Sequence, residues 1–221
     1  MGREAKHAVF EQFARIGKAL SSATRIELID LLAQGERPVD SLARATGTNL
    51  TTVSAHLQAL RQAHLVTTRR EGTRIFYRLA GPDVAELYLQ VQRLAENHLP
   101  DLPAVREAFL GPEDVEQIDR EELWRRARQG TVTVIDVRPP EEYAGGHLPG
   151  AISVPLDQLA DRLADLPTGT EVVAYCRGPY CVLSYAAVRL LRDRGWPARR
   201  LADGILEWRA ADLPVEGTDV A

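Results

Sequence analysis

The two cysteines of the chain stand five residues apart in the stretch VVAYCRGPYCVLSYAAV (172–188), and the 221 residues contain no others. An apolar run ends on Cys176, and an amphipathic run begins after Cys181. In a cytosolic protein, a close cysteine pair is more often catalytic, metal-binding or redox-active than a structural cross-link. The types and spacing of these residues therefore predict reactive thiol chemistry in one short loop.

Cys176 directly follows the strand-like run EVVAY (171–175) and precedes a helical run over 182–194. Ligands of open α/β folds bind at the carboxyl ends of the strands. Backbone N–H groups of a loop and a helix N-terminus favour a thiolate there, and Arg177 is expected to add positive charge. Thiosulfate or another anionic electrophile would be attracted to the same loop. The expected active loop also contains Gly178, Pro179, Tyr180 and Val182.

Composition predicts an ordinary soluble protein of the cytoplasm. The sequence contains no run of 18 apolar residues, so no transmembrane helix is expected. The N-terminal MGREAKHAVFEQF lacks the apolar core of a signal peptide. Charge is distributed unevenly, with 12 Lys and Arg against 7 Asp and Glu in residues 1–81, and 15 against 24 in the rest. This asymmetry favours two modules with different partners and no membrane partner.

The N-terminal part is expected to be mainly α-helical. A short helix over 38–45, a turn containing Gly47 and a longer helix over 50–64 form a helix-turn-helix pattern. The stretch VTTRREGTRIFYRL (66–79) predicts a β-hairpin around Glu71-Gly72. Further helices are expected over 3–19, 22–33 and 82–99.

The helix-turn-helix and the hairpin supply candidate contacts to DNA. Small hydroxyl and amide side chains suit phosphates and base edges in a major groove, and a basic hairpin tip suits the adjacent backbone. The candidates on the second helix are Asn49, Thr51, Thr52, Ser54, His56 and Gln58. Those of the hairpin are Arg69, Arg70 and Arg74.

Residues 20–79, LSSATRIELIDLLAQGERPVDSLARATGTNLTTVSAHLQALRQAHLVTTRREGTRIFYRL, resemble the winged helix of the ArsR family of transcriptional repressors. The resemblance implies a homodimer, joined through the first and last helices, on a pseudo-palindromic double-stranded operator. The thiolate metal sites of that family have no counterpart here. Its carboxylate–histidine site is at best half present, at Asp83 and His98, so no metal is expected.

Beyond a linker expected over 100–113, short apolar runs alternate with helical ones, which predicts an α/β domain with a largely parallel sheet. Three segments resemble rhodanese-like domains: VIDVRPPEEYAGGHLPGAISVPL (134–156), YCRGPYC (175–181) and LADGILEWRAADLPV (201–215). We therefore expect a winged helix-turn-helix domain over 1–99 and a rhodanese-like domain over 114–219.

The second resemblance implies sulfur transfer through a Cys176 persulfide, with thiosulfate, a persulfide or a polysulfide as donor and no cofactor. Phosphatase-type relatives carry Cys-x5-Arg, whereas Val182 occupies the arginine position here. Asp136 and Arg138 are expected to support the fold by an ion pair. Cys181 is expected to act as a resolving thiol, in a bridge to Cys176 that holds inserted sulfur.

Three functions remain open on these grounds. The favoured hypothesis is a DNA-binding regulator, expected to be a repressor, whose rhodanese-like domain senses or transfers sulfane sulfur. The second is chiefly a sulfurtransferase that a winged helix dimerises. The third is a metalloregulator with an inert rhodanese-like domain. The arginines of the hairpin argue against a protein that is chiefly a sulfurtransferase. The missing metal ligands argue against a metalloregulator.

Overall fold

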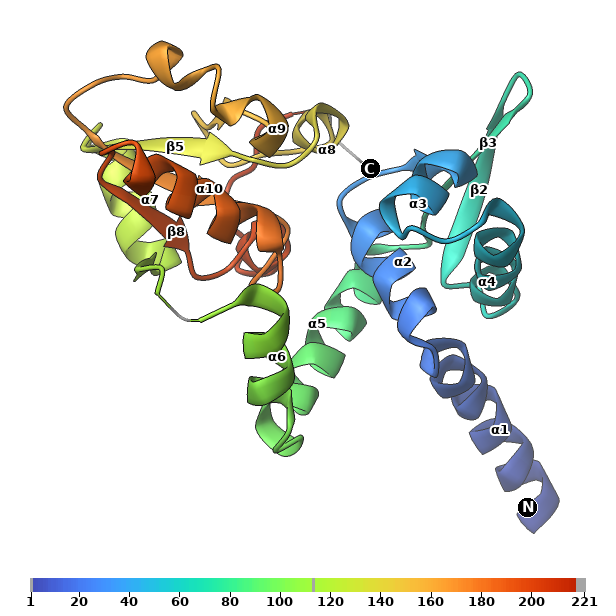
Figure 1. The fold of residues 1–221 in the computed structure, drawn as a ribbon. Helices are drawn as coiled ribbons and strands as arrows, with labels where there is room; N and C mark the ends of the chain where they lie inside the picture. The colour runs from blue at the N-terminus through green and yellow to red at the C-terminus, as the bar shows by residue number, and fades with distance from the viewer. Residues whose placement is uncertain (1, 113, 218–221) are drawn as a thin grey trace. The chain divides into compact units, whose positions relative to one another are not determined.

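The computed structural model describes residues 2–112 and 114–217, which form two compact units that divide between Val91 and Gln92 (Figure 1). The first unit holds, in chain order, α1 (Arg3–Leu20), α2 (Ala23–Ala33), β1 (Arg37–Pro38), α3 (Val39–Ala45), α4 (Leu50–Gln62), β2 (Val66–Glu71), β3 (Arg74–Leu79) and most of α5 (Pro82–His98). The last turns of α5 belong to the second unit.

Helix α4 is anchored by one apolar face. Its side chains Val53, Leu57 and Leu60, spaced three and four residues apart, are fully buried against the rest of the first unit. The helix begins where the side-chain oxygen of Asn49 accepts a hydrogen bond from the backbone N–H of Thr52 at 2.9 Å. The face of α4 opposite the apolar stripe is left toward solvent.

The expected β-hairpin is present and forms the wing. Strands β2 and β3 pair antiparallel from Val66↔Leu79 to Glu71↔Arg74, and β1 joins the other edge of β3. Gly72 has a φ of 59°, the left-handed conformation that glycine adopts most easily, at the first position of the two-residue turn. The observed helix-turn-helix and hairpin confirm the winged helix expected from the sequence.

The second unit is an α/β domain around a five-stranded parallel sheet in the order β4-β8-β7-β5-β6. The largely parallel sheet expected from the sequence is therefore confirmed. The elements are α6 (Leu102–Leu110), β4 (Gln117–Ile118), α7 (Arg120–Arg128), β5 (Val132–Asp136), α8 (Pro140–Ala144), β6 (Ile152–Ser153), α9 (Leu156–Leu159), the 3-10 turn η1 (Leu163–Asp165), β7 (Glu171–Tyr175), α10 (Val182–Asp193), β8 (Ala198–Leu201) and α11 (Ile205–Ala210).

Strand β7 is buried on both faces of this sheet. Val172, Ala174 and Cys176 point into one apolar cluster, while Val173 and Tyr175 point into the other. This alternation explains why the sequence of the strand is an unbroken apolar run. It also places the side chain of Cys176 inside the first cluster, beside residues of α10.

Residues 102–110, which the sequence analysis placed in a linker, form helix α6. Pro103 lies in the first turn of α6, where proline is tolerated because the missing N–H would have no partner within the helix. Leu110 is 5% exposed and belongs to the same cluster as Cys176, and Arg106 donates a hydrogen bond to the Tyr185 hydroxyl at 3.1 Å. Helix α6 is thus an integral part of the second unit.

Across the described residues, no helix combines the length and apolarity that membrane crossing requires.

Candidate functional site

The polar face of α4 carries the residues that the sequence analysis proposed for DNA contact. Thr51 and Gln58 are exposed, whereas Thr52, Ser54 and His56 are partly buried. The Gln58 amide donates a hydrogen bond to the Tyr77 hydroxyl at 3.2 Å, so this side chain also ties α4 to the wing. The oxygen of Asn49 is occupied by the helix cap, whereas Thr51 is exposed in the first turn of α4.

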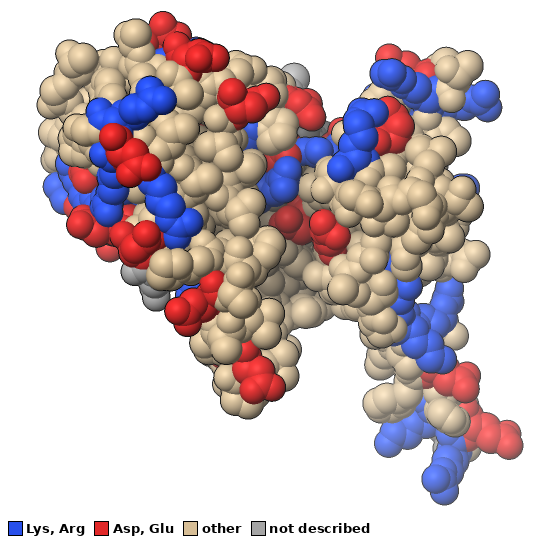
Figure 2. Space-filling model, viewed as in Figure 1, with Lys and Arg blue, Asp and Glu red and all other residues tan. Residues whose placement is uncertain are grey.

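The three wing arginines lie in different surroundings. The guanidinium of Arg69 pairs with Glu36 at 2.9 Å and with Glu71 at 2.6 Å, so two carboxylates compensate its charge. Arg70 donates to the Gly72 carbonyl at 3.0 Å, and Arg74 is exposed. Figure 2 shows acidic as well as basic side chains at the tip of this hairpin. The uncompensated positive charge expected for the wing therefore comes from Arg70 and Arg74 rather than from Arg69.

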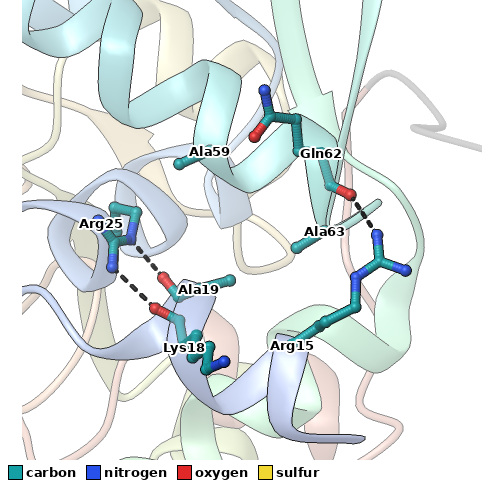
Figure 3. Close-up of a pocket in the computed structure, with 7 residues that line it drawn as sticks. All are labelled: Arg15, Lys18, Ala19, Arg25, Ala59, Gln62 and Ala63. Atoms are coloured by element: carbon teal, nitrogen blue, oxygen red, sulfur yellow. Dashed lines mark hydrogen bonds between the residues drawn. The ribbon is translucent and has the colours of Figure 1, made fainter. Parts of the chain in front are cut away.

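A cavity of about 290 Å³ opens between α1, α2 and α4, and Figure 3 shows the residues around it. Two guanidinium groups occupy its wall. Arg25 donates to the carbonyls of Lys18 and Ala19 at the end of α1, and Arg15 donates to the Gln62 carbonyl at the end of α4, at 3.0 Å. Cationic side chains at helix C-termini satisfy unpaired carbonyls. These arginines are therefore explained by helix capping.

The cysteine loop lies at the carboxyl end of β7, as expected. Cys176 and Cys181 are joined as a disulfide, with a Cα–Cα separation of 6.1 Å. Their side chains are 1% and 9% exposed and belong to the apolar cluster beneath α10. Cys181 is the N-cap residue of α10, which begins regularly at Val182. The first turn of α10 is regular with the disulfide in place.

Backbone contacts fix the curvature of this loop. Residues 178–181 form a turn in which the Cys181 N–H donates to the Gly178 carbonyl at 3.2 Å, with Pro179 at its second position. The Ile205 N–H donates to the Cys176 carbonyl at 3.3 Å. Gly204 lies so close to the Arg177–Gly178 peptide that a Cβ atom would come within 2.3 Å of it. The segment that opens α11 therefore braces the loop from the side.

Arg177 does not supply free positive charge to the sulfur atoms, which corrects the expectation from the sequence. Its guanidinium pairs with the carboxylate of Glu142, with contacts of 2.6–3.1 Å, and that carboxylate is fully buried. A buried carboxylate requires a partner, and Arg177 serves as that partner. The pair instead connects the active loop to α8.

A second buried ion pair lies at the neighbouring strand end. The Arg138 guanidinium donates to both carboxylate oxygens of Asp136, at 2.6–3.2 Å, and to the Gly146 carbonyl at 2.8 Å. The Tyr175 hydroxyl donates to the same carboxylate, and burial followed by the charge of Asp136 raises the pKa of Tyr175 well above its ordinary value. Asp136, Arg138 and Tyr175 thereby tie β5 to the last residue of β7, which supports the structural role expected for the first two.

Tyr180 points out of the loop toward α5. Its hydroxyl donates a hydrogen bond to the Glu96 carboxylate at 2.7 Å, within the second unit. Burial and then this carboxylate raise the pKa of Tyr180 to about 12, so the hydroxyl stays protonated at physiological pH. The active loop is therefore hydrogen-bonded to the last turns of the helix that begins in the first unit.

Among the described residues, no group of three or more His, Cys, Asp or Glu side chains is arranged to hold a metal ion.

Comparison with known families agrees with both units. The model of bacterial regulatory proteins of the ArsR family matches residues 22–68, and the model of the rhodanese-like domain matches residues 119–211. The HTH-type transcriptional regulator Rv0324 of Mycobacterium tuberculosis is 55% identical over 212 residues, which cover 96% of this chain and 93% of that protein. The chain belongs to the ArsR family. This ArsR-family protein is a DNA-binding transcriptional regulator that carries a rhodanese-like domain.

Two further relatives match the parts of this ArsR-family regulator separately. A sulfurtransferase of Allochromatium vinosum is 34% identical, over 46% of this chain and 94% of that protein. The solution structure of the homodimeric winged helix-turn-helix DNA-binding domain of Mb0332 from Mycobacterium bovis is 55% identical. It covers 45% of this chain and 92% of its own, with a TM-score of 0.42.

Sequence reasoning missed the residues that hold the active loop. Glu142 was noted only as part of a family motif, and Gly204, Glu96 and Arg106 received no role. Their partners lie far away in sequence, as with Glu142 and Arg177, or Glu96 and Tyr180. A local pattern carries no signal for such pairings. The structure supplies the missing signal, because it shows Glu142 buried next to the exposed Glu141, and a buried acid implies a cationic partner.

Proposed function

We propose that this ArsR-family regulator is a homodimer that senses sulfane sulfur through Cys176, and that the oxidation state of the Cys176–Cys181 pair sets its affinity for operator DNA. Sulfur donors of this class are thiosulfate, low-molecular-weight persulfides and polysulfides. The reaction occurs in the rhodanese-like unit, and the response is read in the winged helix.

DNA reading is assigned to α4 and the wing. The exposed hydroxyl and amide groups of Thr51 and Gln58 have the size and donor–acceptor character that major-groove edges and phosphates require. Arg70 and Arg74 would bind the adjacent phosphate backbone, where neutralisation of phosphate charge releases counterions. Arg69 would hold the wing in place through Glu36.

Dimerisation is assigned to α1 together with α5. Val9, Phe10 and Phe13 on α1 are 52%, 55% and 64% exposed, and the two phenylalanine rings contact each other edge to face. Exposed aromatic side chains clustered on one helix mark an association surface. Two α1–α5 pairs would place two α4 helices on the half-sites of a palindromic operator.

The sulfur chemistry is assigned to Cys176. This residue lies at the strand end where rhodanese-like domains carry sulfur. Its thiolate would attack the outer sulfur of thiosulfate, forming the Cys176 persulfide and expelling sulfite with the electron pair of the broken sulfur–sulfur bond. No metal or organic cofactor enters this step. The observation that carries the proposal is that the chain's two cysteines meet at this position, beside α10, in a protein that also binds DNA.

The experiment measures DNA affinity before and after sulfur loading. Reduced protein first selects a duplex from a random-sequence pool, and fluorescence anisotropy then gives Kd with and without inorganic polysulfide. We expect polysulfide to weaken binding by about tenfold or more, a coupling typical of allosteric regulators. Cys176→Ser should bind the same duplex with unchanged Kd in both conditions.

The enzymatic alternative predicts a different pattern. A protein that acts chiefly as a sulfurtransferase would turn over thiosulfate and cyanide rapidly at Cys176, while its Kd for DNA would not respond to polysulfide. Response of Cys176→Ser equal to that of the wild type would rule out Cys176 as the sensing residue.

A further inference from the structure

The two cysteines occupy an environment in which a neutral disulfide is favoured over a charged persulfide. Both sulfur-bearing side chains are buried within an apolar cluster that includes Leu110, Tyr185 and Val188. The nearest guanidinium in sequence, that of Arg177, is already paired with the buried carboxylate of Glu142. A Cys176 persulfide anion in this cluster would therefore lack a compensating side-chain cation from Arg177, and burial of an uncompensated charge is costly.

Cys181 is placed to remove that charge. The Cα–Cα separation of 6.1 Å lies inside the range that an ordinary disulfide spans without backbone movement. The turn from Gly178 to Cys181 and the regular start of α10 hold this spacing. As the N-cap residue of α10, Cys181 also lies where the partial positive charge of a helix N-terminus stabilises a thiolate.

We propose that Cys181 resolves the Cys176 persulfide by direct attack and releases sulfide, so that the rhodanese-like unit reduces sulfane sulfur. This inference rests on the function proposed above and specifies its second step. The Cys181 thiolate attacks Sγ of Cys176, the inner sulfur of the persulfide. The new bond is the Cys176–Cys181 disulfide, the bond to the outer sulfur breaks, and that sulfur leaves as hydrosulfide with the electron pair.

The overall reaction is balanced when a thiol reductant reopens the disulfide. Two equivalents of a thiol RSH reduce the pair and become RSSR. Thiosulfate and two RSH are thereby converted to sulfite, hydrogen sulfide and RSSR. The sulfur atom is reduced and the thiols are oxidised. Since the direct disulfide spans the observed Cα separation, no inserted sulfur is needed, which revises the bridge expected from the sequence.

The test is a single turnover of the full-length protein with thiosulfate. The protein is reduced, freed of reductant and mixed with thiosulfate, after which sulfite, sulfide and intact mass are measured. Wild type should release one sulfite and one sulfide per chain and lose the mass of two hydrogens. Cys181→Ser should release one sulfite, no sulfide, and gain the mass of one sulfur atom. Cys181→Ala repeats the comparison without a hydroxyl.

The outcomes separate the two proposals. Sulfite without sulfide from wild type, with a stable persulfide or with a bridge that retains extra sulfur, would overturn sulfide release while leaving Cys176 loading intact. Sulfide from Cys181→Ser and Cys181→Ala at the wild-type yield would also overturn it, because another group would then resolve the persulfide. Absence of sulfite from wild type and both variants would overturn sulfur uptake at Cys176, and the release step with it.

Discussion

Substitution of Asp136 by asparagine tests whether the buried pair beneath the loop is structural. Asp136 and Arg138 are both fully buried, and the carboxylate accepts hydrogen bonds from the Arg138 guanidinium, the Arg138 backbone N–H and the Tyr175 hydroxyl. Burial lowers the pKa of Arg138, but hydrogen bonding and the charge of Asp136 outweigh it and raise that pKa overall. Asp136→Asn therefore leaves a guanidinium charged, buried and without its carboxylate.

The expected cost is large because the remaining charge cannot reach water. Removal of one partner from a buried ion pair destabilises a protein by about 3–5 kcal/mol. With a urea dependence of about 2 kcal/mol per molar, typical of a domain of this size, the unfolding midpoint should fall by roughly 2 M. Asp165→Asn is the matched control. It makes the same chemical change in an exposed ion pair, in which the side chain of Arg162 is 36% exposed and that of Asp165 is 63% exposed. Loss of this pair should cost less than about 1 kcal/mol.

Tryptophan fluorescence reports on the affected unit alone. All three tryptophans, Trp124, Trp196 and Trp208, lie beyond Val91, and Trp208 is 1% exposed. Urea titrations of wild type, Asp136→Asn and Asp165→Asn therefore follow the rhodanese-like unit without interference from the winged helix. DNA affinity without urea serves as a check that the winged helix is unchanged.

Equal midpoints for the two asparagine variants would refute this reasoning. That result would mean that Arg138 finds water or another acceptor when Asp136 is neutral. A variant that keeps its midpoint but loses sulfite release from thiosulfate would assign Asp136 a chemical role instead.

Three further predictions concern the wing, the disulfide and the loop. Arg70→Ala combined with Arg74→Ala should weaken binding to every duplex and flatten the salt dependence by roughly one to two units of log–log slope, because each arginine neutralises phosphate charge; a slope equal to that of wild type would place the wing off the backbone. Reduction of the Cys176–Cys181 disulfide, which joins residues five apart, should lower the free energy of unfolding of the second unit by about 2 kcal/mol. Dithiothreitol should have no such effect on a variant that lacks one of the two thiols, and an equal effect there would contradict the assignment. Tyr180→Phe removes the hydrogen bond to Glu96 and should keep sulfite release while reducing the effect of polysulfide on Kd; a wild-type response would show that the signal takes another route.

The elements of the first unit were predictable because local interactions determine their ends. Asn49 caps α4 through a side chain that lies just before the helix in sequence, and Gly72 forms the turn of the wing. Several helix ends differ from the expected ones by a single residue, and the largest difference is at the C-terminus of α4, expected at His64 and found at Gln62. His64 adopts a left-handed φ of 59°, which a helical periodicity cannot indicate.

Two helices of the second unit escaped prediction for different reasons. The prolines and glycine around α6 are typical of a linker, and burial of Leu110 against a distant core decides otherwise. Helix α7 has only one fully buried side chain, Leu123, so its apolar periodicity is weak. Its start was nevertheless marked by Asp119, whose side chain accepts from the Glu122 N–H at 2.7 Å. The position of Cys176 followed from the strand before it, whereas the ion pairs around the loop depend on the tertiary fold.

The short separation of the two cysteines also determines how such a switch would depend on protein abundance. Both thiols belong to one loop of one chain, so closure is intramolecular, and its rate is independent of how many copies of the protein are present. A bridge between subunits or between separate molecules would form more slowly when the protein is diluted. The threshold of the response would then be set by the ratio of sulfur donor to thiol reductant in the cell. A DNA-binding protein present at a few copies per cell could therefore respond to that ratio at the same threshold as an abundant one.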